Sequence, residues 1–179
     1  MNRDTPREAK PVPLRRVVSG FCLAVLGACA GYSPTSVREG QSASEVVEQM
    51  GTPTGRYARP EGGERLEFAR GPYGKHTFMV DLDASGRVVG WTQVLDESNF
   101  ATLEPGATRE EVLYRFGHPS EVYPIGWQKI DVWAYRYPTY FSLCQWWQVG
   151  MSRDGKVTGT SYGIDPRCDV GRNDGPARP

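Results

Sequence analysis

The chain has 179 residues, enough for one ordinary domain or two small ones, and it balances 21 basic against 21 acidic side chains. Nucleic-acid binding selects a basic excess, so this balance argues against nucleic acid as the main partner. Glycine (21 residues) and proline (14 residues) predict many turns, while an aromatic content of 11% suffices for a folded core and argues against general disorder.

The N-terminal segment has the pattern of a secretion signal. Arg15 and Arg16 precede an apolar run, VVSGFCLAVL, at 17–26. A helix needs about 20 residues to span the hydrocarbon core of a bilayer, so this shorter run suits the hydrophobic region of a signal peptide. The alternatives are an uncleaved amphipathic anchor and a buried apolar strand.

The residues that end this run resemble the lipobox of bacterial lipoproteins: Leu26, two small residues and then Cys29. The resemblance implies that residues 1–28 are removed and that Cys29 carries lipid, which holds the protein to a membrane. Ala30 stands where Asp would favour the inner membrane, and so implies the periplasmic face of the outer membrane. The mature chain would carry 16 basic and 19 acidic residues, so lipid rather than charge would hold it there.

Cysteine usage predicts one disulfide. Cys22 leaves with the signal peptide and Cys29 is consumed by lipid, which leaves Cys144 and Cys168 as an even pair in an oxidising compartment. A bridge between them would close a loop of about 25 residues and stabilise the fold by roughly 3 kcal/mol. The alternative is two separate thiols.

An internal repeat follows the signal segment. GQSASEVVEQMGTP at 40–53 recurs as GATREEVLYRFGHP at 106–119, with matching residues 66 positions apart. In both copies a hydroxyl residue stands three positions before Glu, which predicts a capping box at the start of a helix. Gly and Pro after the apolar face predict the end of that helix about two turns later. Weaker matches at 33–37 and 99–103 predict a helical turn before each helix.

After each helix, apolar residues alternate with polar ones, which predicts strands. The pattern covers Leu66–Phe68, Phe78–Leu82 and 87–94 in the first copy, and Trp133–Tyr137, 145–151 and 156–163 in the second. The predicted fold is therefore α+β, with two tandem repeats that each contain a short helical pair followed by a three-stranded antiparallel meander. The stretch 55–71 is predicted to be a charged loop with an edge strand.

The repeated motif G-x-[ST]-x-x-E-V-x-x-x-x-G-x-P, the aromatic-rich strands and the lipobox together resemble the BamE family, also called SmpA/OmlA. Its members are small outer-membrane lipoproteins with a helix-helix-three-strand fold, and they assist the assembly complex for outer-membrane β-barrels. The fold is also similar to that of the β-lactamase inhibitor protein, which has two such units in tandem. The BamE family usually carries one unit, so the duplication departs from its pattern. The resemblance supplies no catalytic residues.

No catalytic, metal or cofactor site is predicted. His76, His118 and Cys144 do not have the spacing of a metal site. His118 lies in the Gly-His-Pro segment that ends the second helix, and it is predicted to be a surface turn residue.

Aromatic residues supply the candidate binding surface. If Trp147 faces the helices, its neighbour Trp146 faces the opposite side of the sheet. In the first repeat, Met79 and Trp91 are predicted to occupy that same side. Helices on one face of a sheet leave the other face uncovered, so Met79, Trp91 and Trp146 are the candidate partner-binding residues. The alternative is that they pack between the two halves.

The sequence therefore predicts a non-enzymatic outer-membrane lipoprotein that acts as a protein-binding module in the cell envelope, with the β-barrel assembly machinery as a candidate partner. The alternative is a periplasmic enzyme inhibitor or ligand-binding protein that uses a tandem concave sheet. Neither function needs a cofactor or nucleic acid. The predicted parts are a signal peptide (1–28), a lipidated linker (29–36), two repeats (33–98 and 99–165) and a C-terminal tail (166–179).

Overall fold

The computed structural model describes residues 34–69, 74–139 and 145–167. All of them belong to the compact unit Gly31–Pro179, which is separate from the segment Met1–Ala30. The predicted signal peptide and most of the predicted linker and C-terminal tail lie outside the described residues. Within the described part of the chain, no helix is long and apolar enough to cross a membrane.

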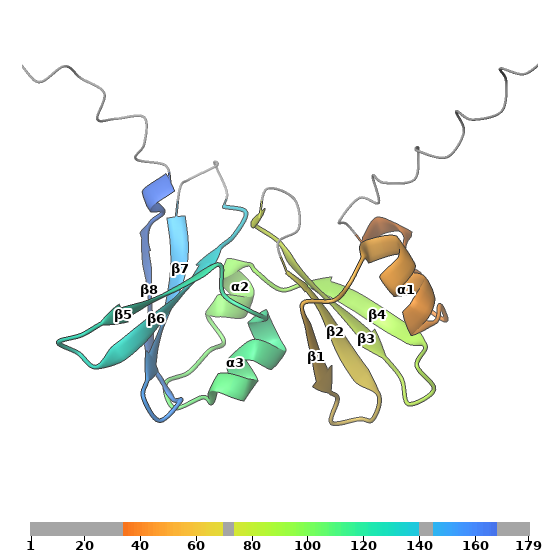
Figure 1. Ribbon diagram of the computed structural model, residues 1–179, viewed down its shortest axis with the longest axis horizontal. Coiled ribbons are helices and arrows are strands. Elements are labelled where there is room, and N and C mark those ends of the chain that lie inside the picture. The colour runs from red at the N-terminus through yellow and green to blue at the C-terminus, as the bar shows by residue number, and fades with distance from the viewer. Residues whose placement is uncertain (1–33, 70–73, 140–144, 168–179) are drawn as a thin grey trace, which may run out of the picture. The chain divides into compact units, whose positions relative to one another are not determined.

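The chain forms two successive sets of helices and strands (Figure 1), which we call the first and the second repeat. The first repeat comprises η1 (Pro34–Ser36), α1 (Ala43–Met50), β1 (Gly55–Ala58), β2 (Glu64–Ala69), β3 (Thr77–Leu82) and β4 (Val88–Gln93). The second comprises α2 (Glu97–Phe100), α3 (Arg109–Phe116), β5 (Glu121–Ile125), β6 (Ile130–Arg136), β7 (Gln145–Ser152) and β8 (Val157–Ile164). Each repeat has one antiparallel sheet, in which strands that follow one another in sequence are paired.

The α+β class is confirmed, but the predicted three strands per repeat are wrong, because each sheet has four. The extra strands, β1 and β5, come directly after the longer helix of each repeat. β5 contains Pro124, which lacks a backbone N–H and is tolerated because β5 is an edge strand. The helical pairs also differ. η1 is a single 3-10 turn, whereas α2 is a short α-helix that crosses the predicted boundary at 98–99.

Both longer helices begin at a side-chain cap. In α1 the predicted capping box is confirmed: the Ser42 hydroxyl accepts the Glu45 N–H (3.4 Å), and the Glu45 carboxylate accepts the Ser42 N–H (2.7 Å). In α3 the Thr108 hydroxyl accepts the Glu111 N–H (3.0 Å). The Glu111 carboxylate pairs with Arg115 one turn later (3.3 Å), so α3 has the cap without the reciprocal bond that the sequence predicts.

Equivalent backbone hydrogen bonds tie the start of each helix to the last strand of the same repeat. The Gly40 N–H donates to the Val88 carbonyl and the Gly106 N–H to the Val157 carbonyl, both at 2.8 Å. Gly40 and Gly106 have φ angles of 83° and 91°, which glycine adopts without strain. The repeat in sequence is therefore also a repeat in backbone geometry at this point.

Two hydrophobic clusters form the cores. The cluster of the first repeat contains Val37, Val46, Met50, Leu66, Phe68, Phe78, Val80, Leu82 and Val88. In the cluster of the second repeat, the Trp147 ring stacks on Phe100 (centroids 4.0 Å apart) and contacts Phe116 edge-on (4.8 Å). Met79, on β3 of the first repeat, also belongs to this second cluster. A side chain of the first repeat thus completes the core of the second.

Helix α3 contacts the face of the first sheet that points away from α1. The Tyr57 and Tyr114 rings meet edge-on, with centroids 6.2 Å apart. The Arg65 guanidinium lies 4.4 Å above the Tyr114 ring and donates to the Tyr114 carbonyl (3.2 Å). This face of the first sheet is therefore covered by α3, contrary to the prediction that it is open.

Candidate functional site

Three of the predicted site residues lie outside the described residues: the lipid-attachment residue Cys29 and the disulfide pair, Cys144 and Cys168. The lipid anchor and the disulfide therefore stay predictions. The other three, the candidate partner-binding residues, are described, and the structure places them in three different environments.

Met79 is 1% exposed, so its predicted exposure is wrong. It does lie on the predicted face of the first sheet, but α3 covers that face and the side chain packs into the core of the second repeat. The alternative prediction, that this side chain packs between the two halves, describes Met79 correctly.

Trp146 is 3% exposed, so its predicted exposure is also wrong. It faces away from the helices as predicted, but other side chains of the same sheet cover it. The Arg136 guanidinium lies 4.9 Å above the ring, and Asp165 (2.6 Å) and Glu121 (2.8 Å) hold that guanidinium in place. Burial alone would raise the pKa of Asp165, but hydrogen bonds from Arg136 and from the Arg167 N–H outweigh this effect and lower the pKa.

Trp91 is 41% exposed, but it lies on the opposite face of the sheet from the one predicted. It pairs with Val80, which is a core residue below α1. Its ring also contacts the Phe78 ring of the same core edge-on, with centroids 6.0 Å apart. Trp91 therefore forms the exposed margin of the first core.

A β-bulge explains this reversal. The register of β3 and β4 shifts between Asp81 and Leu82, where Val89 has no partner. One extra residue in a strand moves every later side chain to the other face, so Trp91 faces α1. The second repeat has an equivalent shift, where β8 skips Thr158.

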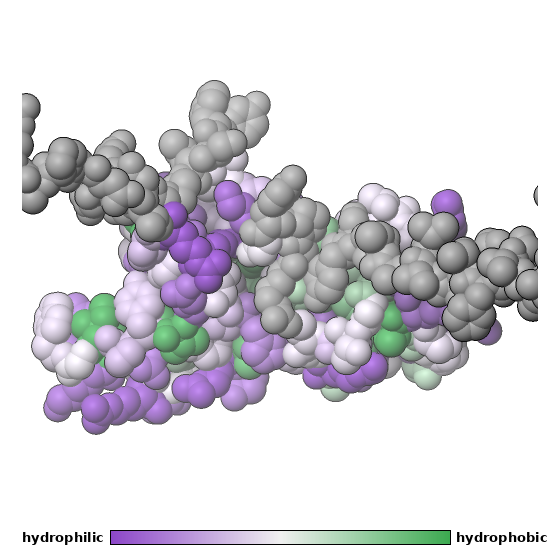
Figure 2. Space-filling view, turned by 45° about the horizontal axis from the view of Figure 1, so that its top comes forward, coloured by the Kyte–Doolittle hydropathy of each residue, from purple (hydrophilic) through white to green (hydrophobic). Residues whose placement is uncertain are grey.

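The tip of the β5–β6 hairpin carries the most exposed large hydrophobic side chain of the described residues. Trp127, in the turn 126–129, is 83% exposed, and Val122 on β5 is 54% exposed. Figure 2 shows hydrophobic side chains on the surface over this hairpin, at the left of the view. Sequence pattern alone does not mark this site, because Pro124 hides the strand before the Gly-Trp-Gln-Lys turn.

The turn that carries Trp127 has a defined geometry. Lys129 has a φ of 58°, a left-handed conformation that costs an L-residue roughly 1 kcal/mol. The Gln128 N–H donates to the Ile125 carbonyl (3.1 Å), and the Lys129 N–H donates to the Gly126 carbonyl (3.3 Å). These bonds close the turn and leave the Trp127 ring in solvent.

A buried carboxylate joins the two repeats. Glu67, on β2, is fully buried and accepts hydrogen bonds from the hydroxyls of Thr54 (2.8 Å) and Tyr57 (2.5 Å). His118 of the second repeat adds its backbone N–H (3.0 Å) and its Nδ1 (2.8 Å). The His118 side chain is half exposed, as expected for a surface turn residue, but its Nδ1 contacts the Glu67 carboxylate. The sequence did not predict this contact. Burial and the Glu67 carboxylate raise the pKa of Tyr57 well above its ordinary value.

Two glycines make room for this carboxylate. A Cβ on Gly117 would lie 2.8 Å from the Glu67 Cδ, and a Cβ on Gly55 would lie 2.5 Å from its Oε2. In the second repeat the equivalent position holds Ala134, whose carbonyl accepts the Ser120 N–H. The carboxylate is therefore specific to the first repeat. The sequence concealed it, because a polar residue that alternates with core residues is expected to face solvent.

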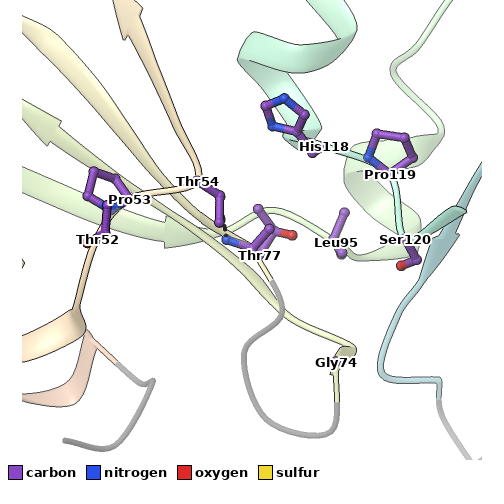
Figure 3. A pocket seen from close by; sticks show the side chains of 10 residues that line it. Thr52, Pro53, Thr54, Gly74, Thr77, Leu95, His118, Pro119 and Ser120 are labelled. Carbon is purple, nitrogen blue, oxygen red and sulfur yellow. Dashed lines mark hydrogen bonds between the residues drawn. The ribbon is translucent and has the colours of Figure 1, made fainter.

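An open hollow of about 540 Å³ lies beside this contact (Figure 3). Its lining comes from both repeats and includes Thr54 and Thr77 from the first, and His118, Pro119 and Ser120 from the second. The volume is within the usual range for ligand pockets, roughly 300–1,000 Å³, but such pockets are mostly apolar. Hydroxyl side chains and prolines make up much of this lining.

The Glu67–His118 pair fixes the orientation of an imidazole, as carboxylates do in acid–base sites. Among the described residues, no serine, threonine or cysteine side chain is hydrogen-bonded to His118. In the same part of the chain, no three His, Cys, Asp or Glu residues gather where they could hold a metal ion. The observed contacts form a polar joint between the repeats.

No protein-family model matches the chain, and no curated protein or solved structure matches it either. The resemblance to the BamE family therefore stays a prediction from the repeated motif and the lipobox.

Proposed function

We propose that the chain is a lipid-anchored, non-enzymatic protein of the bacterial outer membrane that binds another envelope protein through the tip of the β5–β6 hairpin. The observation that carries this proposal is the exposure of Trp127 on a turn of defined geometry. Tryptophan is among the residues that dominate the binding energy of protein interfaces, so an exposed one held on a closed turn is a candidate contact residue.

The hairpin suits binding through side chains. Because its turn is closed by backbone hydrogen bonds, Trp127 loses little conformational freedom when a partner covers it. Pro124 interrupts the row of N–H donors on this edge strand, which disfavours the addition of a further strand. A partner with an apolar pocket for the indole ring fits these features best.

The cellular location rests on the sequence around Cys29. A lipidated cysteine followed by Ala30 would hold the protein on the periplasmic face of the outer membrane. The β-barrel assembly machinery is a candidate partner on the strength of the BamE resemblance. A soluble periplasmic enzyme is the candidate partner on the strength of the β-lactamase inhibitor resemblance.

Affinity purification from solubilised outer membranes tests the proposal with three tagged proteins: wild type, Trp127→Ala and Tyr162→Ala. Tyr162 is the matched control, because it is a half-exposed aromatic side chain on β8, the opposite edge of the same sheet. All three should unfold at nearly the same temperature. The partner that elutes with wild type should elute with Tyr162→Ala, and Trp127→Ala should bind it at least about tenfold more weakly.

The identity of the eluted partner separates the two resemblances. Subunits of the β-barrel assembly machinery would favour the BamE-like role, and a single soluble enzyme would favour the inhibitor role. A partner that binds Trp127→Ala as tightly as wild type would reject the hairpin tip as the binding site.

A further inference from the structure

We propose that the exposed edge of β4 in the first repeat contacts the lipid bilayer, with the Trp91 ring at the membrane interface. The inference rests on the lipid anchor of the proposed function and assigns a second surface, separate from the hairpin tip. We call this the β4 surface and define it by Trp91 and the hollow beside it.

The β4 surface presents one large exposed side chain. Trp91 is 41% exposed, and β4 is the last strand of its sheet. A hollow of about 610 Å³ lies against it, lined by Val37, Arg38, Glu39, Val88, Gly90 and Trp91. The bulge at Val89 produces this arrangement, because it turns Trp91 toward the side of the sheet where the chain enters the fold.

The lipid anchor is close to this surface along the chain. Four residues, 30–33, separate Cys29 from Pro34, so the fold begins at most about 18 Å from the lipidated residue. The 3-10 turn η1 follows directly, and its Pro34 carbonyl accepts the N–H of Val37 at 2.9 Å. Val37 lines the hollow beside β4. Acylation of Cys29 therefore holds the β4 surface within reach of the membrane.

Such a short tether makes weak membrane contacts effective. A linker of only a few residues gives the tethered surface an effective concentration in the millimolar range. Trp91 then gains by leaving water, because the indole ring is favoured at the level of the lipid headgroups. The β4 surface needs no high intrinsic affinity for lipid to remain at the bilayer.

The contact should be apolar rather than ionic. Arg38 and Glu39 lie side by side in the hollow and oppose each other in charge, and Arg87 donates to the Gly40 carbonyl (3.0 Å). The mature chain also carries more acidic than basic residues. Binding through this surface should therefore persist at high salt, which weakens contacts between exposed charges.

Fluorescence quenching tests the proposal on the lipidated protein, purified from membranes and reconstituted in phosphatidylethanolamine–phosphatidylglycerol vesicles with brominated acyl chains. Three proteins are compared: wild type, Trp91→Phe and Trp127→Phe. Trp127 is the matched control, because it is exposed but belongs to the other repeat. Quenching by the bromolipid should disappear in Trp91→Phe, stay at the wild-type level in Trp127→Phe, and remain at high salt.

Equal quenching of wild type and Trp91→Phe would overturn the proposal. So would a loss of quenching at high salt, which would indicate an ionic contact. Residues 30–33 are the other possible occupant of the hollow. If they cover it, Trp91 in the unlipidated Cys29→Ser protein would be shielded from acrylamide, a water-soluble quencher, and this would also overturn the proposal.

Labelling with radioactive palmitate separates this inference from the proposed function. A protein that carries palmitate but shows no quenching from Trp91 would overturn only the membrane contact. A protein without acyl chains would overturn the lipid anchor itself, and the membrane contact with it.

Discussion

The Glu67 carboxylate of the first repeat accepts two hydrogen bonds from His118 of the second, one from its backbone N–H (3.0 Å) and one from its Nδ1 (2.8 Å). Tyr57 and Thr54 occupy the remaining acceptor positions of the same carboxylate. A fully buried carboxylate is costly unless its acceptor positions are filled. The second repeat therefore stabilises a charge that the first repeat alone would bury with fewer partners.

Replacement of this carboxylate should destabilise the protein strongly. Glu67→Ala leaves the partly buried Tyr57 hydroxyl and His118 N–H without their acceptor, and the loss of an acceptor from a buried donor costs about 1–3 kcal/mol. We expect a decrease of about 3 kcal/mol or more in the free energy of unfolding in urea. The control is Glu64→Ala on the same strand, which removes a partly exposed ion pair with Arg56 and should cost less than about 1 kcal/mol. Equal effects would contradict the special role of Glu67.

The Asp165–Arg136 pair should make stability depend on acid. Because the folded protein lowers the pKa of Asp165, this carboxylate stabilises the fold above its unfolded pKa of about 3.9. That contribution is lost as the pH falls through the lower folded pKa. Asp165→Asn should therefore reduce the melting temperature at pH 7 and flatten its fall below about pH 4. The control is Asp131→Asn at an exposed position, which should leave the melting temperature at pH 7 nearly unchanged.

The two neighbouring tryptophans of β7 should both be needed for folding, although they face opposite sides of the sheet. Trp147 lies in the core on Phe100, and Trp146 lies below Arg136. Truncation of a buried tryptophan to alanine costs about 3–5 kcal/mol, so Trp146→Ala and Trp147→Ala should each unfold at much lower urea concentration than wild type. Trp127→Ala should change stability by no more than about 0.5 kcal/mol. A stable Trp146→Ala protein would show that the ring contributes little to the fold.

Cys144 and Cys168 should form a disulfide in the protein isolated from cells without reductant. Alkylation of the denatured protein should label neither residue before reduction and both after it. Reduction should lower stability by roughly 3 kcal/mol, as the loop-entropy account predicts for a loop of about 25 residues. Free labelling of both thiols without reductant would show that they are separate.

The sequence predicted the helices of this fold well because local rules determine them. Ser42 and Thr108 each cap the helix that the repeated motif predicts, and Gly51 and Gly117 end it with positive φ angles. Hydrogen bonds within a few residues fix these features, so no knowledge of the rest of the fold is needed. The α+β class follows for the same reason.

The faces of the strands were harder to predict because they depend on pairing with other strands. The bulge at Val89 reverses the alternation that placed Trp91, and no local residue pattern marks it. Met79 and Trp146 have the predicted orientation but are covered, one by α3 and the other by Arg136. Orientation can be predicted from alternation, whereas burial depends on elements distant in sequence.

The candidate sites also differ in whether local sequence or distant contacts determine them. Trp127 could have been selected from its Gly-Trp-Gln-Lys turn if the strand that contains Pro124 had been recognised. The partners of Glu67 come from β1 and from the segment after α3, so its burial is visible only in the folded chain.

The replacement of Glu67 by Ala134 at the equivalent position means that the two repeats are no longer interchangeable. If the order of the repeats were exchanged, the N–H groups after the helix of the trailing repeat would meet the Ala134 methyl group, and Glu67 would lie on the terminal sheet without His118. The two copies of the unit therefore differ at a position where they contact each other, so their order along the chain matters. A single excised first repeat would expose Met79 and leave Glu67 without the hydrogen bonds from His118, so neither exchanging nor separating the repeats should yield a protein as stable as the tandem.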